Sequence, residues 1–459
     1  MPQSMVLLEL NELCPSLMYR FMRDGGLPNF ERLHNEANVY TTDAQEEAPF
    51  LEPWIQWVTV HTGMPYREHQ IFRLSDGRLL KHKCIWDILS ENGRRVWVCG
   101  SMNVRYDRPI NGLVLPDPWD AEIGPSNPEL NDYLRFVQRN TQEHANKHLH
   151  LSVADHARFV AFMLRHGLSL ESARAIVRQL ASERGGRNRW RRAAILDKLQ
   201  FDLFAHYFSR LKPHFSTFFL NSVAHFQHLY WRNLEPDLFE RKPSAQEQME
   251  YESAILFGYQ EMDRLIGRFF GLVGDETTLV LCTGLSQQPC LKYEAQGGRL
   301  FYRPRDFGQL LAFAGVRQYA GIVPVMSECF NVRFDSEAAA SEAESRLARL
   351  RVDGVAALFV ERQADSLHAG CRLSNDVPMN ARLSLEGEDR SALFSDHFYQ
   401  VDGIKSGMHH PDGLLWIRQP GRKHAIHLDK IPLTSVAPMI LDIFAVPKPQ
   451  HMQADWTLH

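Results

Sequence analysis

Val6-Leu7-Leu8-Glu9-Leu10 is a short, almost wholly apolar run that ends at the polar residues Asn11 and Glu12. Runs of this length, bounded by polar or turn residues, are typical of strands buried on both faces of a parallel sheet. The chain repeats the pattern at Val96 to Cys99, Thr217 to Leu220 and Thr278 to Cys282.

Segments with helical spacing separate these runs. Pro28 to His34 and Ile85 to Asn92 have apolar residues at helix-compatible intervals, and Gly93 is a plausible C-terminal stop for the second. Near the end of the chain, Leu414 to Arg418 resembles a strand and Thr434 to Phe444 a helix. The alternation of strand and helix predicts an α/β fold, a doubly wound, mostly parallel sheet with helices on both faces.

Two segments interrupt this alternation. With 459 residues the chain exceeds the usual size of a single core. Residues 126–212 show helical periodicity alone, so we expect a helical insertion that caps the cleft and selects the substrate. Residues 291–400 mix a strand at Phe330 to Phe334, a polar helix at Ser336 to Arg351 and a strand at Val355 to Val360. The predicted domains are therefore an α/β core (1–125, 213–290 and 401–459), the helical cap and a small α+β subdomain.

Net charge, apolar runs and cysteine usage exclude several classes of partner and location. The net charge of −4 argues against a nucleic acid polymer as partner, and no apolar run approaches the roughly 20 residues that cross a bilayer, so no membrane insertion is expected. Met1 to Glu9 lacks the features of an export signal. The seven cysteines are odd in number and scattered, which favours reduced thiols in the cytoplasm. A homo-oligomer remains open.

Six fragments, in this order, carry a resemblance to a known family. They are Leu7 to Glu12 with Leu27-Pro28-Asn29-Phe30; Thr62-Gly63 with Pro65 and His69-Gln70-Ile71; Trp86 to Gly93 with Asn111-Gly112; Phe218 to Trp231; Asp263 to Gly267; and Gly407 to Gly413. Together they resemble the phosphodiesterase and nucleotide pyrophosphatase branch of the alkaline phosphatase superfamily. The resemblance implies the alkaline-phosphatase-like fold and two divalent metals, usually zinc, beside a Thr or Ser nucleophile that attacks phosphorus.

Several positions that match the family's site carry other residues. Asn11 stands where the first strand ends in a metal-binding Asp, and the nucleophile position falls on Pro53 or Glu52, neither of which has a hydroxyl. Ala224 replaces the Asp of the middle motif, whereas its His is retained as His228, and the late His is retained as His409. The Asp and His of the family's third motif are both absent from Cys282 to Ser286.

These replacements bear on the metal content. The resemblance implies that a two-metal centre is lost. A single divalent metal, zinc or manganese, bound by His228 and His409 is one alternative, with a third ligand from His225, His410, Glu52 or Glu12. The other alternative is that these histidines are hydrogen-bonded loop residues left from an ancestor.

Other polar residues are candidates for catalysis and substrate binding. Glu52, with Asn11 and Glu12, could act as a general base or a carboxylate nucleophile, or Glu52 is simply one of several charged loop residues. Arg105 and Arg108 could clamp an anionic group, with surface salt bridges as the alternative. Asn221, in the fragment Phe218 to Trp231, is a third candidate for substrate binding.

The function that follows is that of a divergent phosphodiesterase-like phosphoesterase, either hydrolase or transferase. Its expected substrate is an anionic phosphorylated small molecule, such as a nucleotide- or sugar-linked ester. Two rival hypotheses are a pseudoenzyme with a binding or regulatory role, and a metal-free acid–base transferase that uses Glu52 and His409.

Overall fold

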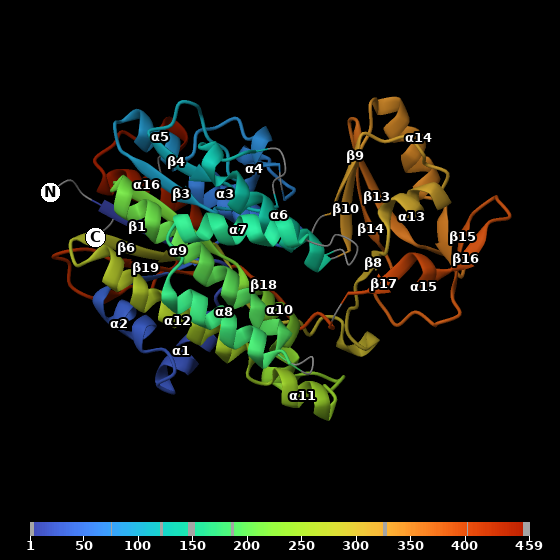
Figure 1. Ribbon diagram of the computed structural model, residues 1–459, viewed down its shortest axis with the longest axis horizontal. Helices are drawn as coiled ribbons and strands as arrows, with labels where there is room; N and C mark the ends of the chain where they lie inside the picture. The colour runs from blue at the N-terminus through green and yellow to red at the C-terminus, as the bar shows by residue number, and fades with distance from the viewer. Residues whose placement is uncertain are drawn as a thin grey trace.

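The central element of the protein is a twisted nine-stranded sheet (Figure 1). The structure is a computed structural model, and it describes residues 4–74, 76–119, 123–145, 152–184, 188–324, 328–401 and 403–452. The strands follow the order β20-β2-β19-β6-β1-β5-β3-β4, with β21 paired to β2. Of the described strands in this sheet, β19 alone runs antiparallel to both of its neighbours. The predicted α/β fold with a mostly parallel sheet is therefore confirmed.

The strands of this sheet agree closely with the apolar runs of the sequence. Their bounds are β1 (Ser4–Leu10), β2 (Asn38–Asp43), β3 (Val96–Cys99), β4 (Gly112–Leu115), β5 (Phe215–Leu220), β6 (Thr277–Cys282), β19 (Asp412–Arg418), β20 (Ala425–Ile426) and β21 (Ile431–Pro432).

Helices cover both faces of the sheet because the strands are apolar on both faces. Leu8 and Leu10 of β1 face one core, and Met5 and Leu7 face the other. The first core packs against α1 (Pro15–Arg23), α2 (Pro28–Glu36), α9 (Ala193–Leu211), α10 (Ser222–Leu234) and α12 (Ala254–Val273). The second packs against α3 (Pro53–Thr62), α5 (Ile85–Glu91) and α16 (Val436–Ile443). The short helices α4 (Tyr66–His69) and α11 (Ala245–Tyr251) lie at the periphery.

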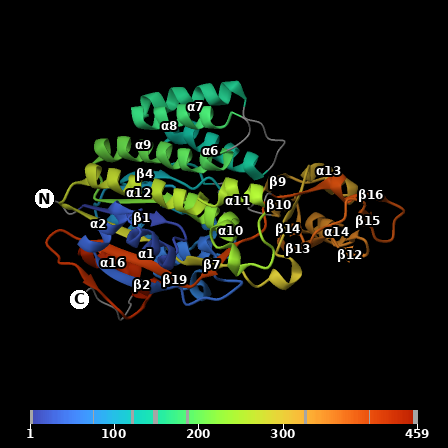
Figure 2. The same ribbon diagram turned by 90° about the horizontal axis from the view of Figure 1, so that it is seen from below.

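The described part of the helical insertion forms a layer on one face of the sheet. It contains α6 (Asn131–Ala145), α7 (Val153–Arg165) and α8 (Leu170–Ser182), and it leads into α9. Tyr133 of α6 and Phe159 and Phe162 of α7 belong to the same core as Leu8 of β1. In Figure 2, α7 and α8 lie outside α9, above the face of the sheet. The insertion therefore shares the core of the α/β domain, and α7 and α8 do not lie over the strand ends where a cap was expected.

Residues 291–400 hold an apolar core of their own, formed by residues from Leu300 to Phe398 (Figure 1). The strands are β8 (Tyr302–Pro304), β9 (Gly321–Pro324), β10 (Cys329–Arg333), β11 (Leu350–Val352), β12 (Val355–Ala356), β13 (Leu358–Gln363), β14 (Ser366–Cys371), β15 (Arg382–Leu385), β16 (Ser391–Leu393) and β17 (Phe398–Gln400). The helices are α13 (Phe307–Phe313), α14 (Glu337–Leu347) and α15 (Phe394–His397).

Two element predictions in this region were wrong in detail. The helix expected to reach Arg351 ends at Leu347, because Leu350 and Val352 are buried in strand pairing with β15. The strand expected over Val355 to Val360 is divided between two sheets, β12 and β13. Both boundaries depend on pairing with distant strands, which local periodicity does not contain.

In the part of the chain that the structure describes, no helix is both long and apolar enough to cross a membrane.

Candidate metal-binding active site

The candidate site lies at the carboxyl edge of the sheet, just beyond the ends of β1 and β5. The turn Asn11-Glu12 follows β1, and its backbone N–H groups donate to Leu220 O at 3.0 Å and Thr283 O at 3.4 Å. A two-stranded antiparallel ribbon of β7 (Ser286–Pro289) and β18 (Gly407–His410) flanks this edge and pairs His409 with Gln287. Segments from distant parts of the sequence therefore meet at one edge, as expected where parallel strands end together.

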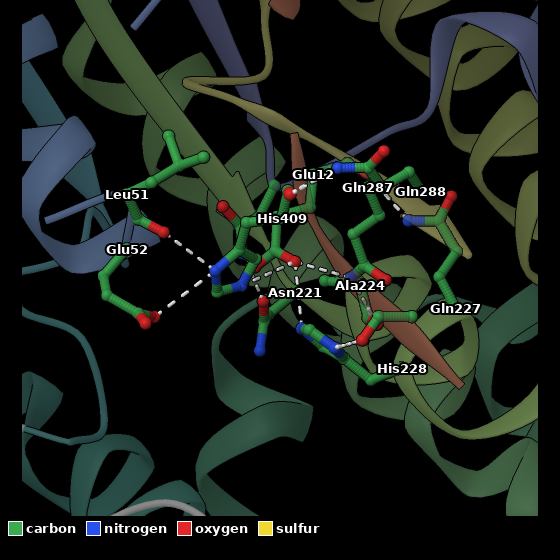
Figure 3. A network of polar contacts seen from close by, with 12 residues as sticks. Glu12, Leu51, Glu52, Asn221, Ala224, Gln227, His228, Gln287, Gln288 and His409 are labelled. Carbon is green, nitrogen blue, oxygen red and sulfur yellow. Dashed lines mark hydrogen bonds and ion pairs between the residues drawn. The ribbon is translucent and has the colours of Figure 1, made fainter. Parts of the chain in front are cut away.

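Glu12 and two imidazoles form the centre of the site (Figure 3). Glu12 Oε2 lies 3.0 Å from His228 Nε2 and 3.4 Å from His409 Nε2. One ligand atom from each of the three side chains lies within 4.8 Å of the others. Glu12 is buried and has φ of 62°, a left-handed conformation that is uncommon for a residue other than glycine. Such backbone conformations concentrate at functional sites because neighbouring contacts must maintain them.

The tautomers of both histidines follow from their second contacts. His228 Nδ1 lies 3.1 Å from Gly407 O, and His409 Nδ1 lies 2.9 Å from Leu51 O. A carbonyl oxygen only accepts hydrogen bonds, so Nδ1 carries the hydrogen in each ring. In the neutral ring the lone pair is then on Nε2, which faces Glu12. Metal-binding histidines commonly donate Nδ1–H to a backbone carbonyl in this way.

The donor set fits one divalent cation. Two neutral imidazole nitrogens and a carboxylate oxygen are zinc ligands, and donor atoms around a tetrahedral zinc with bonds of about 2.0–2.2 Å lie roughly 3.4 Å apart. The separations of 3.0 and 3.4 Å from Glu12 Oε2 agree with that spacing. Without a proton or a cation between them, two nitrogen lone pairs would face a carboxylate and repel it.

Amide groups hold the Glu12 carboxylate in position. Asn11 Nδ2 donates to Glu12 Oε1 at 2.7 Å, and Gln287 Nε2 donates to Glu12 Oε2 at 2.5 Å and to Ala224 O at 3.0 Å. Gly407 makes room for this arrangement, since a Cβ there would lie 2.2 Å from Gln287 Oε1. The same close approach brings the Gly407 carbonyl to His228.

The charges of the site act on one another. Burial raises the pKa of Glu12, but the positive charges of His409 and His228 outweigh it and hold that pKa well below its usual range. Burial lowers the pKa of His409, and the Glu12 and Glu52 carboxylates reverse this, so the net shift is upward. Burial raises the pKa of Glu52 against the opposing charges of His409 and Lys405. Glu12 is thus ionised, and Glu52 is the weaker acid of the two.

Glu52 is one of the two residues, with Pro53, on which the resemblance places the nucleophile position. It is the N-cap residue of α3, directly before Pro53 in the first turn, and its side chain is 31% exposed. Glu52 Oε2 lies 3.4 Å from His409 Nδ1. A carboxylate therefore stands at the rim of the site, one imidazole away from Glu12.

A second chain of amides extends from Asn11 toward β5. Asn11 Nδ2 donates to Asn221 Oδ1 at 2.7 Å, and Trp57 Nε1 donates to Asn11 Oδ1 at 2.8 Å. Because Trp57 uses the Asn11 amide oxygen, Asn11 orients its neighbours in this structure rather than offering that oxygen to a metal. The amide orientation leaves Asn221 Nδ2 as a donor for a further partner (Figure 3).

A second metal site of the family type lacks its ligands here. Residues 282–286, where the resemblance places the Asp and His of that site, contain no acid or histidine. Among the described residues, Glu12, His228 and His409 form the only group of three or more side chains with metal-ligand spacing.

The remaining predicted residues lie outside this network. His225 is not a member of the three-residue group, and Glu12 occupies the third position instead. Arg105 pairs with Asp107 at 2.6 Å and Asp87 at 3.6 Å, and Arg108 donates to Tyr106 Oη at 2.6 Å and to Pro125 O. In the described part of the chain neither arginine forms a hydrogen bond or ion pair with Glu12 or Glu52, so their role as a substrate clamp stays a prediction.

Several residues of the site were not predicted as functional. Gln287, Gln227, Tyr259 and Lys405 are not among the site residues that the sequence predicts. Gln227 Nε2 donates to Glu12 O at 2.8 Å, and Tyr259 Oη donates to Gln227 Oε1 at 2.8 Å. Cys14 N in turn donates to Tyr259 Oη at 2.7 Å. The sequence offers one indication of their role, which is that Gln227 directly precedes His228. That position does not show whether the Gln227 side chain is buried beneath the site or exposed on the surface.

Comparison with known proteins gives structural relatives alone. No family model and no curated protein matches the chain. Solved structures to which it is similar include murine ectonucleotide pyrophosphatase/phosphodiesterase 5, with 9% identity, a TM-score of 0.43 and coverage of 98% of this chain and 97% of that chain. The chain is also similar to phosphonoacetate hydrolase from Sinorhizobium meliloti, with 12% identity and a TM-score of 0.43. That match covers 97% of this chain and 96% of the hydrolase chain. A third similar structure is alkaline phosphatase PafA, with 11% identity and a TM-score of 0.47. That match covers 98% of this chain and 97% of the PafA chain.

The likeness concerns the fold and not the chemistry, and the fold itself is defined by the strand order and the two cores described above. The protein is thus an α/β protein whose candidate site lies at the carboxyl edge of a mostly parallel sheet.

The support beneath Glu12 gives a testable expectation. Tyr259→Phe leaves Gln227 Oε1 and the Cys14 N–H without their buried partner, which costs about 1–3 kcal/mol in the free energy of unfolding. Loss of such an outer contact should also weaken divalent metal binding about 10- to 100-fold. Chemical denaturation and calorimetric zinc titration measure the two effects.

The matched control is Tyr133→Phe in α6. Tyr133 is also a buried tyrosine, but among the described residues its hydroxyl has no hydrogen-bond partner. Equal zinc affinity in the Tyr259 variant and the wild type would show that this network does not position Glu12.

Proposed function

We propose that the protein is a hydrolase or transferase of small phosphorylated esters, such as nucleotide- or sugar-linked esters, and that it uses one divalent cation, zinc or manganese. Glu12, His228 and His409 would hold the ion. The observation that carries the proposal is that both Nδ1 atoms contact backbone carbonyls, so that both Nε2 atoms converge on one buried carboxylate oxygen. This is the arrangement of a histidine–carboxylate metal site with its outer contacts in place.

The charge balance of the site supports an anionic substrate. A bound cation would neutralise phosphoryl oxygens and lower the pKa of an attacking water or hydroxyl. Lys405, whose charge acts on both Glu52 and His409, is a further attraction for an anion. Asn221 Nδ2 can donate to a phosphoryl oxygen. Without any cation, the carboxylates of Glu12 and Glu52 would repel such a substrate.

Glu52 is the group that we assign to proton transfer. Its pKa is raised by burial, which brings it closer to neutral pH and suits a general base. It would take the proton of the attacking water or hydroxyl, or attack phosphorus itself as a carboxylate nucleophile. Asn11, through its hydrogen bonds to Glu12 and Asn221, keeps both side chains in position.

A second candidate function is that of a pseudoenzyme that binds an anionic ligand. It is favoured by the absence of a hydroxyl at residues 52 and 53 and by Ala224 in place of an acid. A third is metal-free acid–base transfer by Glu52 and His409, favoured by their contact of 3.4 Å. We also propose that the protein is located in the cytoplasm, because all seven cysteines are free thiols.

Metal analysis and turnover together test these functions. The protein, purified without chelator, should contain near-stoichiometric zinc or manganese, and a panel of phosphate monoesters and diesters should include a substrate that is hydrolysed only while the metal is present. A preparation that neither binds metal nor turns over any ester after metal addition would establish the pseudoenzyme. Turnover that survives complete chelation would establish the metal-free mechanism.

A further inference from the structure

The outer side of the helical insertion exposes large apolar side chains. Six of them, 50% to 87% exposed, lie within two consecutive helices. They are Val153, Val160 and Leu164 of α7 and Leu170, Val177 and Leu180 of α8. Elsewhere in the described residues, exposed large apolar side chains are scattered singly, apart from the pair Ile426 and Leu428, and such side chains need no explanation. We call these six residues the outer apolar face.

The spacing shows that this face is distinct from the core side of each helix. In α7, Phe159, Phe162 and Met163 are buried in the core. Val153, Val160 and Leu164 follow one another at intervals of seven and four, so they line one side of the helix, separate from the buried side. Leu170, Val177 and Leu180 of α8 repeat the pattern at intervals of seven and three, away from buried Ser172. Each helix therefore has an uncovered apolar side, which in α7 is additional to the apolar side that packs on the core.

The two helices of the outer apolar face also carry arginines that do not pair with the acidic side chains of these helices. Arg165, Arg174 and Arg178 are exposed, and the described chain contains no ion pair for any of them. The acidic residues of the same two helices and of the turn after α8 already have partners: Asp155 with Arg139 at 2.9 Å, Glu171 with Arg268 at 3.7 Å, and Glu183 with Arg192. The face is thus apolar and positively charged.

We propose that the outer apolar face docks the protein on the surface of an anionic lipid bilayer. An amphipathic helix with aliphatic residues on one side and basic residues beside them binds at the interface of such a membrane. The apolar side chains enter the headgroup region, and the long arginines reach the lipid phosphates. This docking needs no membrane-spanning helix, and the described residues contain none.

Charge and shape favour a bilayer over the other occupants. A second copy of the chain would bring arginines against arginines, because the acids of the face are engaged within their own chain. Figure 2 shows α7 and α8 as the outermost layer on this side of the molecule, which suits a flat and extended surface. The candidate site lies at the strand ends, where His228 of α10 and His409 of β18 meet Glu12, and docking through α7 and α8 leaves it uncovered.

Vesicle sedimentation with the full chain tests the proposal. The protein should sediment with phosphatidylcholine vesicles that contain one third phosphatidylglycerol, and not with pure phosphatidylcholine. Val160→Ser combined with Leu164→Ser should lower the partition about ten-fold or more, because aliphatic area is removed. Arg174→Gln combined with Arg178→Gln should lower it roughly thirty-fold, since each basic residue near the surface contributes about 1 kcal/mol. Added salt should weaken the binding.

Matched substitutions elsewhere on the surface show whether binding depends on the outer apolar face or is non-specific adsorption of the protein to vesicles. Leu428 is 92% exposed, and the Arg67 side chain is 82% exposed, so Leu428→Ser and Arg67→Gln should sediment like the wild type. Thermal melting by circular dichroism verifies that each variant is folded.

Three results would overturn the proposal. One is sedimentation that is absent, or that the two double variants leave unchanged. Another is a wild-type dimer in light scattering that Val160→Ser with Leu164→Ser dissociates, which would identify a second copy as the occupant. The last is binding to soluble polyglutamate that is as tight as binding to vesicles and indifferent to the apolar substitutions, which would identify an acidic protein.

Discussion

His228→Ala is expected to remove the bound divalent metal from the protein. The substitution takes away one of two nitrogen ligands and leaves Glu12 with His409 alone. The loss in affinity should exceed the 10- to 100-fold that removal of an outer partner of a ligand costs. Metal analysis of protein purified without chelator should then find less than about a tenth of the wild-type content, and added zinc should no longer raise the melting temperature.

The control for this experiment is His225→Ala. His225 lies in the same helix, α10, three residues before His228, and it is outside the three-residue group. It receives the same substitution, so the difference between the two variants isolates the imidazole that faces Glu12. Equal metal content in both variants would reject the single-metal site, and loss in the His225 variant alone would restore His225 as the ligand.

Glu52→Gln is expected to abolish turnover without changing the metal content. Glutamine has nearly the same shape but cannot accept a proton at neutral pH, and positioned acid–base groups contribute about 10²- to 10⁴-fold to rates. Glu52 contacts His409 at Nδ1 rather than Nε2, so the metal ligands keep their positions. Steady-state kinetics with the best ester of the panel, together with metal analysis of the same preparation, measures both effects.

Glu47→Gln provides the comparison for Glu52. Glu47 is an exposed acid in the same loop, five residues earlier, and its substitution changes the net charge by the same amount. A rate that falls equally in both variants would mean that loop charge, not a base, is responsible. An unchanged rate in Glu52→Gln would make Glu52 a charged loop residue without a chemical role.

Much of the core could be predicted from the sequence because local patterns dictate it. The apolar runs at β1, β3, β5 and β6 are buried on both faces, and such runs have few alternatives to a parallel sheet. The convergence of Asn11, Glu52, His228 and His409 was also expected, since each follows or flanks an element that ends at the same sheet edge. The six fragments that resemble the family indicated which of these residues correspond to positions of the family's site.

The contacts that make the site work could not be predicted in this way. Gln287 reaches Glu12 only because β7 pairs with β18, and that pairing requires Gly407 to approach without a Cβ. Tyr259 supports Gln227 from α12, some thirty residues away in sequence. A hydrogen bond between distant segments leaves no periodic signal in either of them.

For this protein, the sequence by itself determined the layered α/β architecture and the residue types available at the strand ends, because both follow from local apolar spacing and from the identity of each side chain. The tertiary structure alone decided that Glu12, rather than His225, completes the group with His228 and His409, and that α7 and α8 leave an apolar side uncovered. Ligand geometry and exposure depend on separations of a few tenths of an ångström to a few ångströms between segments that are far apart along the chain, and only the packed molecule sets those separations.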